Sequence, residues 1–263
     1  MQIMPLTRSM KVLGTIFLSI SICQILLPIT SLKAEECATP IISGPPAWPP
    51  FVFPKNDTGE RWGVAIDISQ QVFTSIGAKN SVDTIKPWKR VLRDLEQGKI
   101  DLIFALLVSK ERRDKYIYTD AWAYDTYGVV TLKGKEFKYS SVEDLRNHSG
   151  AYYADLRIPK PLNQVFEQGK NFQSIKDVAS LYKVLHQGRV DYLIVSVPSF
   201  VWFIPDQYRK NDFSVIKESL VTLPVYMALS RKSPCAQFID EINVELRARK
   251  KIIEEMFELN NKD

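Results

Sequence analysis

Two segments of this 263-residue chain follow the same pattern, and they begin ninety residues apart, at Leu95 and Leu185. LEQGKIDLI (95–103) and LHQGRVDYLI (185–194) share leucine, glutamine, glycine, a basic residue, an aliphatic residue and aspartate in the same order. Each segment predicts the end of an amphipathic helix, a glycine that stops the helix, and a buried strand. Because one helix–strand unit occurs twice, the sequence predicts two α/β lobes of similar construction.

Further helices and strands are predicted around these units. The run Asp67-Ile-Ser-Gln70 predicts a capping box at a helix start, and Gly77 is placed to end that helix. The tail from Pro234 to Leu259 predicts one or two helices. Short strands are predicted at 40–43, 81–85, 100–107, 149–154, 171–175 and 189–197. This alternation of strands and helices again favours an α/β fold.

The first 34 residues have the features of a secretory signal. Arg8 and Lys11 precede an apolar run, and Ala34 supplies a small residue at the predicted cut. Gln24 and Pro28 make the apolar run short for a membrane span, and an uncleaved membrane anchor is the alternative. Cleavage would lower the net charge from +5 to +2, because three basic residues and no acid would leave. Such a charge gives no electrostatic footprint for nucleic acid, and we expect no nucleic-acid partner.

The mature chain would retain two cysteines, Cys37 and Cys235. In an oxidising compartment a single pair suggests one disulfide, which would tie the N-terminus to a point near the C-terminal helices. Two unpaired buried thiols are the alternative.

Motifs for metals, cofactors and catalysis are absent from the sequence. Its two histidines, His148 and His186, do not form an HExxH motif and are expected to be structural. The sequence also lacks a GxGxxG motif, a phosphate-binding loop and a GxSxG motif. We therefore expect no metal, no cofactor and no enzymatic activity.

The stretch GPPAWPPFVF (44–53) holds Trp48 between prolines. Proline fixes φ and removes a backbone donor, so the segment is predicted to be stiff and extended. Trp48 is then either a core-filling residue in a buried turn or a preset aromatic wall of a binding site.

The resemblance to a known family rests on five stretches in order. After GPPAWPPFVF come GERWGVAIDISQQVFTSIG (59–77), PWKRVLRDLEQGKIDLI (87–103), SKERRDKYIYTDAW (109–122) and VASLYKVLHQGRVDYLIV (178–195). Together they resemble a family 3 extracellular solute-binding protein, the periplasmic receptor type of amino-acid ABC transporters. The resemblance covers nearly the whole mature chain. It implies an α/β periplasmic-binding-protein fold of type II, in which two hinge strands join two lobes around a ligand cleft.

The resemblance also implies how the chain is divided. The crossings between lobes are expected near Tyr124 to Tyr127 and near Val221 to Tyr226. Both cysteines would then lie in the same lobe, where a disulfide could form. The implied divisions are a signal peptide at 1–34, lobe 1 at 35–125 and 223–263, and lobe 2 at 126–222.

Several residues match ligand-facing positions of the family. The resemblance implies that Trp48 stacks on the ligand and that Trp88 provides a second wall, although Trp88 also fits the apolar stripe of its helix. Arg112 matches the arginine that holds a ligand carboxylate, a task for which the guanidinium fork is suited. The stretch between Asp101 and Arg112 is one residue shorter than usual, so Arg113 is the competing candidate.

Two departures from the family pattern concern the ligand. The hydroxyl residue expected before the arginine is replaced by Leu107, and Ser196 stands where an acid usually meets the ligand's amino group. Asp155 could supply the missing charge, or it could cap a loop.

The function implied is capture of a small polar or amphiphilic solute, either amino-acid-like or an organic acid. The protein is expected to be a periplasmic monomer that serves an ABC importer. One alternative is a ligand-sensing module for a membrane partner, if the N-terminal segment stays uncleaved. The other is a cyclic-acid dehydratase on the same fold.

Overall fold

The structure, a computed structural model, describes residues 37–54, 59–83, 86–154, 158–167 and 171–260. The predicted signal peptide and Asp155 lie outside these ranges. No helix within them is long and apolar enough to cross a membrane.

Nine strands of the described residues form one mixed sheet in the order β2-β1-β3-β9-β5-β8-β6-β7, with β4 paired to β9. Strands β1, β2 and β3 pair in parallel, and so do β6, β7 and β8, as helix–strand units require. The strands are β1 (Ile41–Ser43), β2 (Ser81–Val82), β3 (Leu102–Leu106), β4 (Tyr116–Tyr118), β5 (Ala123–Leu132), β6 (Gly150–Tyr153), β7 (Phe172–Ile175), β8 (Tyr192–Ser196) and β9 (Phe213–Ser230).

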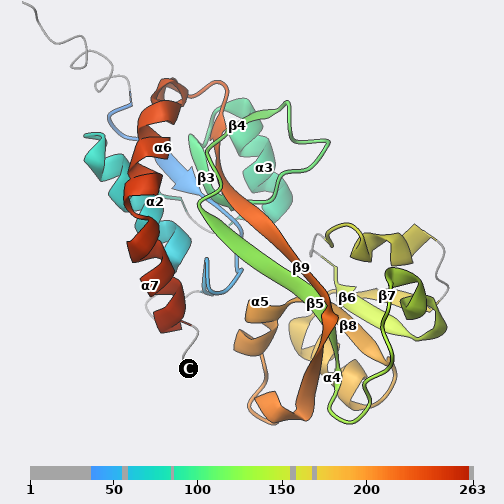
Figure 1. Ribbon diagram of the computed structural model, residues 1–263. Coiled ribbons are helices and arrows are strands. Elements are labelled where there is room, and N and C mark those ends of the chain that lie inside the picture. Colours follow the sequence, from blue (N-terminus) through green and yellow to red (C-terminus); the bar gives the residue numbers. More distant parts are fainter. Residues whose placement is uncertain (1–36, 55–58, 84–85, 155–157, 168–170, 261–263) are drawn as a thin grey trace, which may run out of the picture.

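The helices form two groups, one at each end of the sheet (Figure 1). The first group contains α2 (Val64–Ser75), α3 (Trp88–Gln97), α6 (Ile239–Ala248) and α7 (Lys250–Asn260), and the second contains α4 (Val178–His186) and α5 (Val197–Trp202). Short 3₁₀ helices occur at η1 (Val142–Asn147), η2 (Leu162–Glu167), η3 (Lys210–Asp212) and η4 (Pro234–Phe238).

Strands β5 and β9 connect the two groups, and Figure 1 shows both running from one to the other. They pair antiparallel from Ala123 opposite Val225 to Leu132 opposite Phe213. The end of β9 also pairs with β3 and β4 of the first group, whereas β5 pairs with β8 of the second. The molecule therefore has two α/β lobes joined by two strands, which confirms the predicted fold class.

The two predicted crossings face each other across β5 and β9. Tyr124 lies opposite Pro224, and Tyr127 lies opposite Val221. We keep the lobe boundaries at 125/126 and 222/223 as a prediction, since the strands pass through this region without a break.

The repeated units have equivalent structures. Gly98 and Gly188 both adopt positive φ, 77° and 65°, where each helix ends. In each unit the aspartate three residues after the glycine accepts a hydrogen bond from the start of the strand that lies beside it in the sheet. Asp101 accepts a hydrogen bond from the backbone N–H of Ile41 at 2.7 Å, and Asp191 accepts one from the N–H of Ser149 at 2.7 Å. The shared pattern thus encodes a helix stop and a strand anchor in each lobe.

The predicted capping box at Asp67 is wrong. Helix α2 begins three residues earlier, at Val64, with Gly63 as its N-cap residue. Gly63 has φ of 137°, and a Cβ atom there would lie 2.5 Å from the carbonyl oxygen of Phe51. Close packing against the Phe51 backbone therefore sets the start of the helix. Its predicted end is confirmed, because Gly77 follows with φ of 82°.

The C-terminal tail forms two helices, as predicted. Helices α6 and α7 pack against α2 and bury Ile242, Leu246 and Ile253. Lobe 1 therefore contains segments from both ends of the chain.

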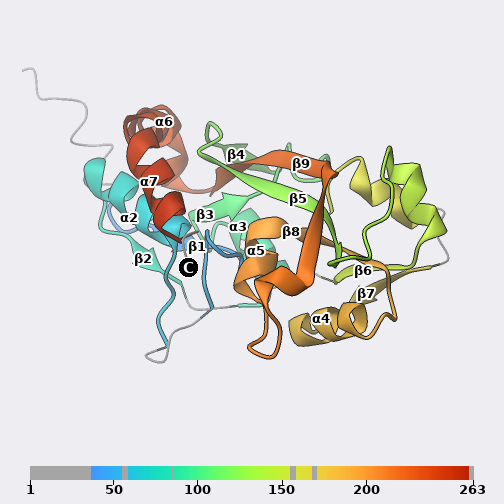
Figure 2. The same cartoon turned by 60° about the horizontal axis from the view of Figure 1, so that its bottom comes forward.

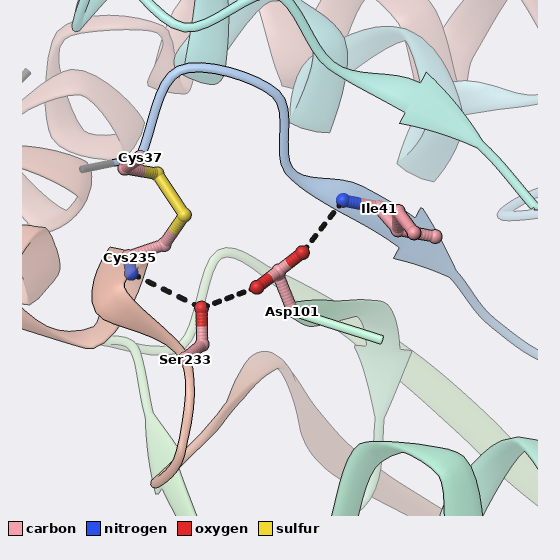
Figure 3. Close-up of a disulfide and its surroundings, with 5 residues drawn as sticks. All are labelled: Cys37, Ile41, Asp101, Ser233 and Cys235. Carbon is pink, nitrogen blue, oxygen red and sulfur yellow. Dashed lines mark hydrogen bonds between the residues drawn. A yellow bond between two sulfur atoms is a disulfide. The ribbon is translucent and has the colours of Figure 1, made fainter. Parts of the chain in front are cut away.

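The predicted disulfide joins Cys37 to Cys235, whose Cα atoms are 4.9 Å apart (Figure 3). The Ser233 hydroxyl accepts a hydrogen bond from the N–H of Cys235 at 3.0 Å and donates one to Asp101 at 2.6 Å. Asp101 in turn accepts from Ile41, so the disulfide and these hydrogen bonds tie η4 to the start of β1. The alternative of two unpaired thiols is therefore wrong.

Candidate binding site between the two lobes

Trp48 is held in a tight turn by its proline-rich segment. The N–H of Trp48 donates to the carbonyl of Val52 at 2.7 Å, and the N–H of Val52 donates back at 3.0 Å. The turn directs Phe51 into the core, where it is 1% exposed, while Trp48 stays half-buried at its edge. Phe51 therefore fills the core in this turn, and Trp48 stays partly exposed at the edge of the core.

An arginine that the sequence analysis did not single out supports the same segment. Arg61 donates hydrogen bonds to the carbonyls of Gly44 and Pro45, and its guanidinium lies 5.2 Å from the ring centroid of Phe104. Burial lowers the pKa of Arg61 to about 10, and the charge of Asp83 partly offsets that effect. Proline-rich loops lack backbone donors, and Arg61 supplies donors for two of the carbonyls.

The indole of Trp48 reaches a buried carboxylate on β5. Its Nε1 donates to Oδ2 of Asp125 at 2.9 Å, and the Ser196 hydroxyl at the end of β8 donates to Oδ1 at 2.9 Å. The Tyr127 hydroxyl and the backbone N–H of Thr126 also hydrogen-bond this carboxylate. Asp125 is 1% exposed. It therefore connects a residue of lobe 1 with one of lobe 2 at the strand where the lobes meet.

Burial is the main cause that raises the pKa of Asp125 to about 6, and the hydrogen bonds from Trp48, Ser196 and Tyr127 oppose it. A desolvated carboxylate favours its neutral form, because water no longer stabilises the charge. Sequence reasoning missed Asp125. The available signal was a single acid in the otherwise uncharged strand AYDTYGVVTL (123–132) at a predicted crossing.

This pKa predicts a pH dependence of stability. In the folded protein Asp125 keeps its proton up to about pH 6, whereas an unfolded aspartate releases it near pH 4. Binding of this proton therefore stabilises the folded state fully below about pH 4, and the stabilisation is lost as the pH rises through 6. The linkage amounts to about 3 kcal/mol. Between pH 4 and pH 7, we expect urea unfolding to show the Asp125→Asn variant gaining this amount relative to the parent. Parallel pH profiles for the two proteins would contradict the assignment.

A second contact between the lobes involves α5, which lies at their junction in Figure 2. The Ser199 hydroxyl donates to the carbonyl of Pro49 at 2.7 Å. Beside it, Trp202 packs edge-on against Phe53, with ring centroids 4.4 Å apart, and Phe53 stacks on Trp62 at 3.7 Å. The two lobes therefore touch through both polar and aromatic groups.

Trp88 and Arg112 lie together in lobe 1. The guanidinium carbon of Arg112 is 5.8 Å from the ring centroid of Trp88, a cation–π arrangement. Arg112 is half-buried, whereas Arg113 is exposed. Trp88, the first residue of α3, is half-buried and packs against the core beneath that helix. Its packing agrees with the apolar stripe considered from the sequence, and its role as a wall of the site stays a prediction.

The predicted site residues are therefore brought together in two pairs. Trp48 and Ser196 meet through Asp125, and Trp88 meets Arg112. The predicted role of each residue in binding a ligand stays a prediction. Among the described residues, no group of three or more histidine, cysteine or acidic side chains is placed to hold a metal ion.

The fold and the junction between its lobes define a two-lobed binding protein of the periplasmic type. Residues 41–252 match the bacterial extracellular solute-binding proteins, family 3, and the chain belongs to this family. The family resemblance predicted from the sequence is thus confirmed. The members of this family are extracellular solute-binding proteins of bacteria.

Two curated relatives are cystine-binding proteins. The L-cystine-binding protein TcyJ of Escherichia coli (strain K12) is 25% identical over 164 residues, which is 62% of this chain and 60% of TcyJ. The L-cystine-binding protein TcyA of Bacillus subtilis (strain 168) is 20% identical over 201 residues, 76% of this chain and 72% of TcyA. The match thus spans only three fifths of the length of TcyJ.

Solved structures show the same fold. AncCDT-1, an ancestral amino acid-binding protein and precursor of cyclohexadienyl dehydratase, has a TM-score of 0.70 at 18% identity, covering 89% of this chain and 99% of AncCDT-1. An ancestral arginine-binding protein bound to glutamine has a TM-score of 0.65 at 20% identity, covering 84% and 97%. At such identities the likeness establishes the fold alone.

Proposed function

We propose that this protein binds a small amino-acid-like solute between its two lobes and presents it to an ABC importer. The observation that carries the proposal is the meeting of Trp48 with the buried pair Asp125 and Ser196 at the lobe junction. Binding sites for small molecules combine apolar walls with a few placed polar groups, and they occur preferentially between domains. An indole face beside a carboxylate and a hydroxyl provides both elements.

The remaining parts of the proposal concern where and how the protein works. We propose that residues 1–34 are a signal peptide, that the mature protein is periplasmic, and that it acts as a monomer. Lobe 2 would comprise residues 126–222 and would close on lobe 1 around the solute by bending at β5 and β9. Hinge closure of this kind is the usual motion of periplasmic binding proteins.

A thermal-shift panel tests the function directly. The mature protein would be heated with L-cystine, L-arginine, L-glutamine, the other amino acids, polyamines, organic acids and aromatic compounds. A ligand that binds only the folded state, present at a hundred times its Kd, stabilises that state by about 2.7 kcal/mol. We expect at least one amino acid to raise the melting temperature. Product formation from a cyclic acid would instead favour the dehydratase alternative.

Trp48→Ala is expected to weaken solute binding while changing stability little. Trp48 is half-buried at the edge of the core, so its truncation leaves a smaller cavity than truncation of an enclosed side chain. Binding would be measured by calorimetry and stability by urea unfolding. The parent should also show a change in tryptophan fluorescence and a smaller radius by X-ray scattering when solute is added.

Trp122→Ala provides the matched control for this experiment. Trp122 is 7% exposed and packs against Phe51 and Phe257 in the core of lobe 1. Its truncation should cost about 3–5 kcal/mol of stability, as for other buried aromatic residues. If Trp48→Ala destabilises the protein as much as Trp122→Ala and the folded variant binds solute normally, Trp48 is a core residue and not a wall of the site.

A further inference from the structure

Phe53 is a fully buried aromatic residue that the core of its own lobe does not enclose. It is 1% exposed, yet it lies outside the core cluster that contains its neighbours Phe51 and Val52. Two indoles cover it instead. Trp62 stacks on the Phe53 ring with centroids 3.7 Å apart, and Trp202 meets that ring edge-on at 4.4 Å. Trp62 belongs to lobe 1 and Trp202 to lobe 2, so the burial of Phe53 depends on both lobes.

The lobe 1 half of this aromatic cluster is fixed by its own backbone. The N–H of Phe53 donates to the carbonyl of Trp62 at 2.9 Å, and their two rings are parallel to within 11°. Helix α2 begins two residues after Trp62, at Val64, and anchors the segment to the lobe. Phe53 and Trp62 therefore form a preassembled surface that does not need lobe 2 for its shape.

Trp202 is the last residue of α5, a helix that is fastened to lobe 2. Phe200 of α5 is 5% exposed in the core of lobe 2 and stacks on Tyr182 at 4.7 Å. Residues two positions apart on a helix do not share a face, so Trp202 points away from that core. Its ring partners among the described residues are Phe53 and, at 6.1 Å, Trp62. Trp202 is thus carried by lobe 2, and its aromatic contacts lie in lobe 1.

Separation of the lobes would break the contacts of Trp202 and uncover Phe53. Edge-on aromatic pairs attract one another beyond the effect of the area that they bury. A contact that exists in one of two conformations shifts the equilibrium toward that conformation by its own free energy. None of the three rings is among the groups that hydrogen-bond Asp125, so the cluster acts apart from that carboxylate.

We propose that Phe53, Trp62 and Trp202 form a clasp that favours the closed arrangement of the lobes, and that Trp202 sets the affinity for solute without touching it. The apparent Kd equals the intrinsic Kd divided by the fraction of molecules that are competent to bind. Loss of the clasp therefore weakens the binding of every solute by the same factor. The statement about affinity rests on the proposed function, whereas the statement about the lobes does not.

The test compares Trp202→Ala with the parent by calorimetry, with L-cystine, L-glutamine and L-arginine as probes, and by X-ray scattering without solute. If the parent is mostly open before binding, the variant should lose about tenfold in affinity, equally for each probe that the parent binds. If the parent is mostly closed, the variant should have a larger radius of gyration, and saturating solute should restore the radius of the parent.

Leu259→Ala is the matched control, because Leu259 is an exposed apolar residue of α7 with 67% exposure. Its affinity should stay within twofold of the parent, and its radius should be unchanged. Trp202→Phe retains an aromatic edge and should bind within threefold of the parent.

A double-mutant cycle shows whether the two indoles act as one contact. Trp62→Ala removes the lobe 1 indole and should repeat the effect of Trp202→Ala. The variant that carries both changes should lose less affinity than the product of the two single losses, because each change breaks the same clasp.

The outcomes separate the clasp from the proposed function. Affinities of Trp202→Ala within threefold of the parent, together with an unchanged radius, would overturn the clasp. Losses that differ more than fivefold between probes would also overturn it, because the rings would then contact the solute, and so would single losses that multiply in the double variant. If the parent binds no compound of the panel, the proposed function fails and the radius without solute decides alone. A larger radius for Trp202→Ala then supports the clasp, and equal radii overturn it.

Discussion

A variant in which Cys37 and Cys235 are both replaced by serine is expected to lose about 5 kcal/mol of unfolding free energy in the chain-entropy description of disulfides. The two cysteines are 198 residues apart in sequence, so the bridge restricts most of the chain in its unfolded state. Both are buried, at 3% and 1% exposure, and they fasten the start of the chain to η4. Urea unfolding of the mature protein, compared with the parent, measures the difference.

Ser233→Ala is the matched control for the disulfide variant. It removes the hydroxyl that accepts from the N–H of Cys235 and donates to Asp101, and it leaves the bridge in place. Loss of these hydrogen bonds should cost about 1–2 kcal/mol. If the double serine variant is no less stable than Ser233→Ala, the bridge contributes little beyond its local contacts. Equal urea midpoints for the parent with and without reductant would lead to the same conclusion.

The architecture could be predicted from the sequence because its signals are local. Gly98 and Gly188 stop helices through their own backbone freedom, and Asp101 and Asp191 anchor the strand that lies next to them in the sheet. A pattern of a few residues therefore carries the information for each unit. Its repetition indicates two lobes before any long-range contact is known.

Local signals fail where a distant segment decides the outcome. Asp67 has the spacing of a capping box, but helix α2 starts at Val64 because Gly63 fits against the backbone of Phe51. Arg61 has no sequence signal that would distinguish it from a solvated arginine, although the structure places it against the proline-rich loop. In both cases the deciding partner lies in the preceding loop, across a turn whose geometry the sequence does not specify.

The candidate site shows the same limit at longer range. Trp48 could be predicted as a rigid aromatic group, since its prolines are adjacent to it. Its hydrogen-bond partner Asp125 is 77 residues away, and Ser196 is a further 71 residues along the chain. The pairing of β5 with β8 brings Asp125 and Ser196 together, and the proline-rich turn brings Trp48 to them. The sequence offers no means of seeing that Ser196 and Trp48 share a buried carboxylate.

Arg112→Ala is expected to weaken binding of an amino acid by about 2–5 kcal/mol, the usual cost of removing a charged partner from a desolvated contact. Arg112 is half-buried, and its guanidinium lies against Trp88 at 5.8 Å, which orients the group and limits its access to water. Two parallel donors on such a group suit a solute carboxylate. Calorimetry with L-glutamine, L-cystine and L-arginine would measure the loss, and the melting temperature without solute should change little.

Arg113→Ala is the control, and it decides between adjacent residues. Both arginines follow Ser109 in one turn, and their N–H groups donate to its carbonyl at 3.1 and 2.9 Å, so the backbone positions them alike. Their side chains differ, because Arg113 is exposed and lies in no ion pair among the described residues. An exposed arginine contributes little to a closed site, so its replacement should change affinity less than threefold. A greater loss for Arg113→Ala than for Arg112→Ala would move the carboxylate contact by one residue. Equal small losses for both would place the carboxylate contact elsewhere in the junction.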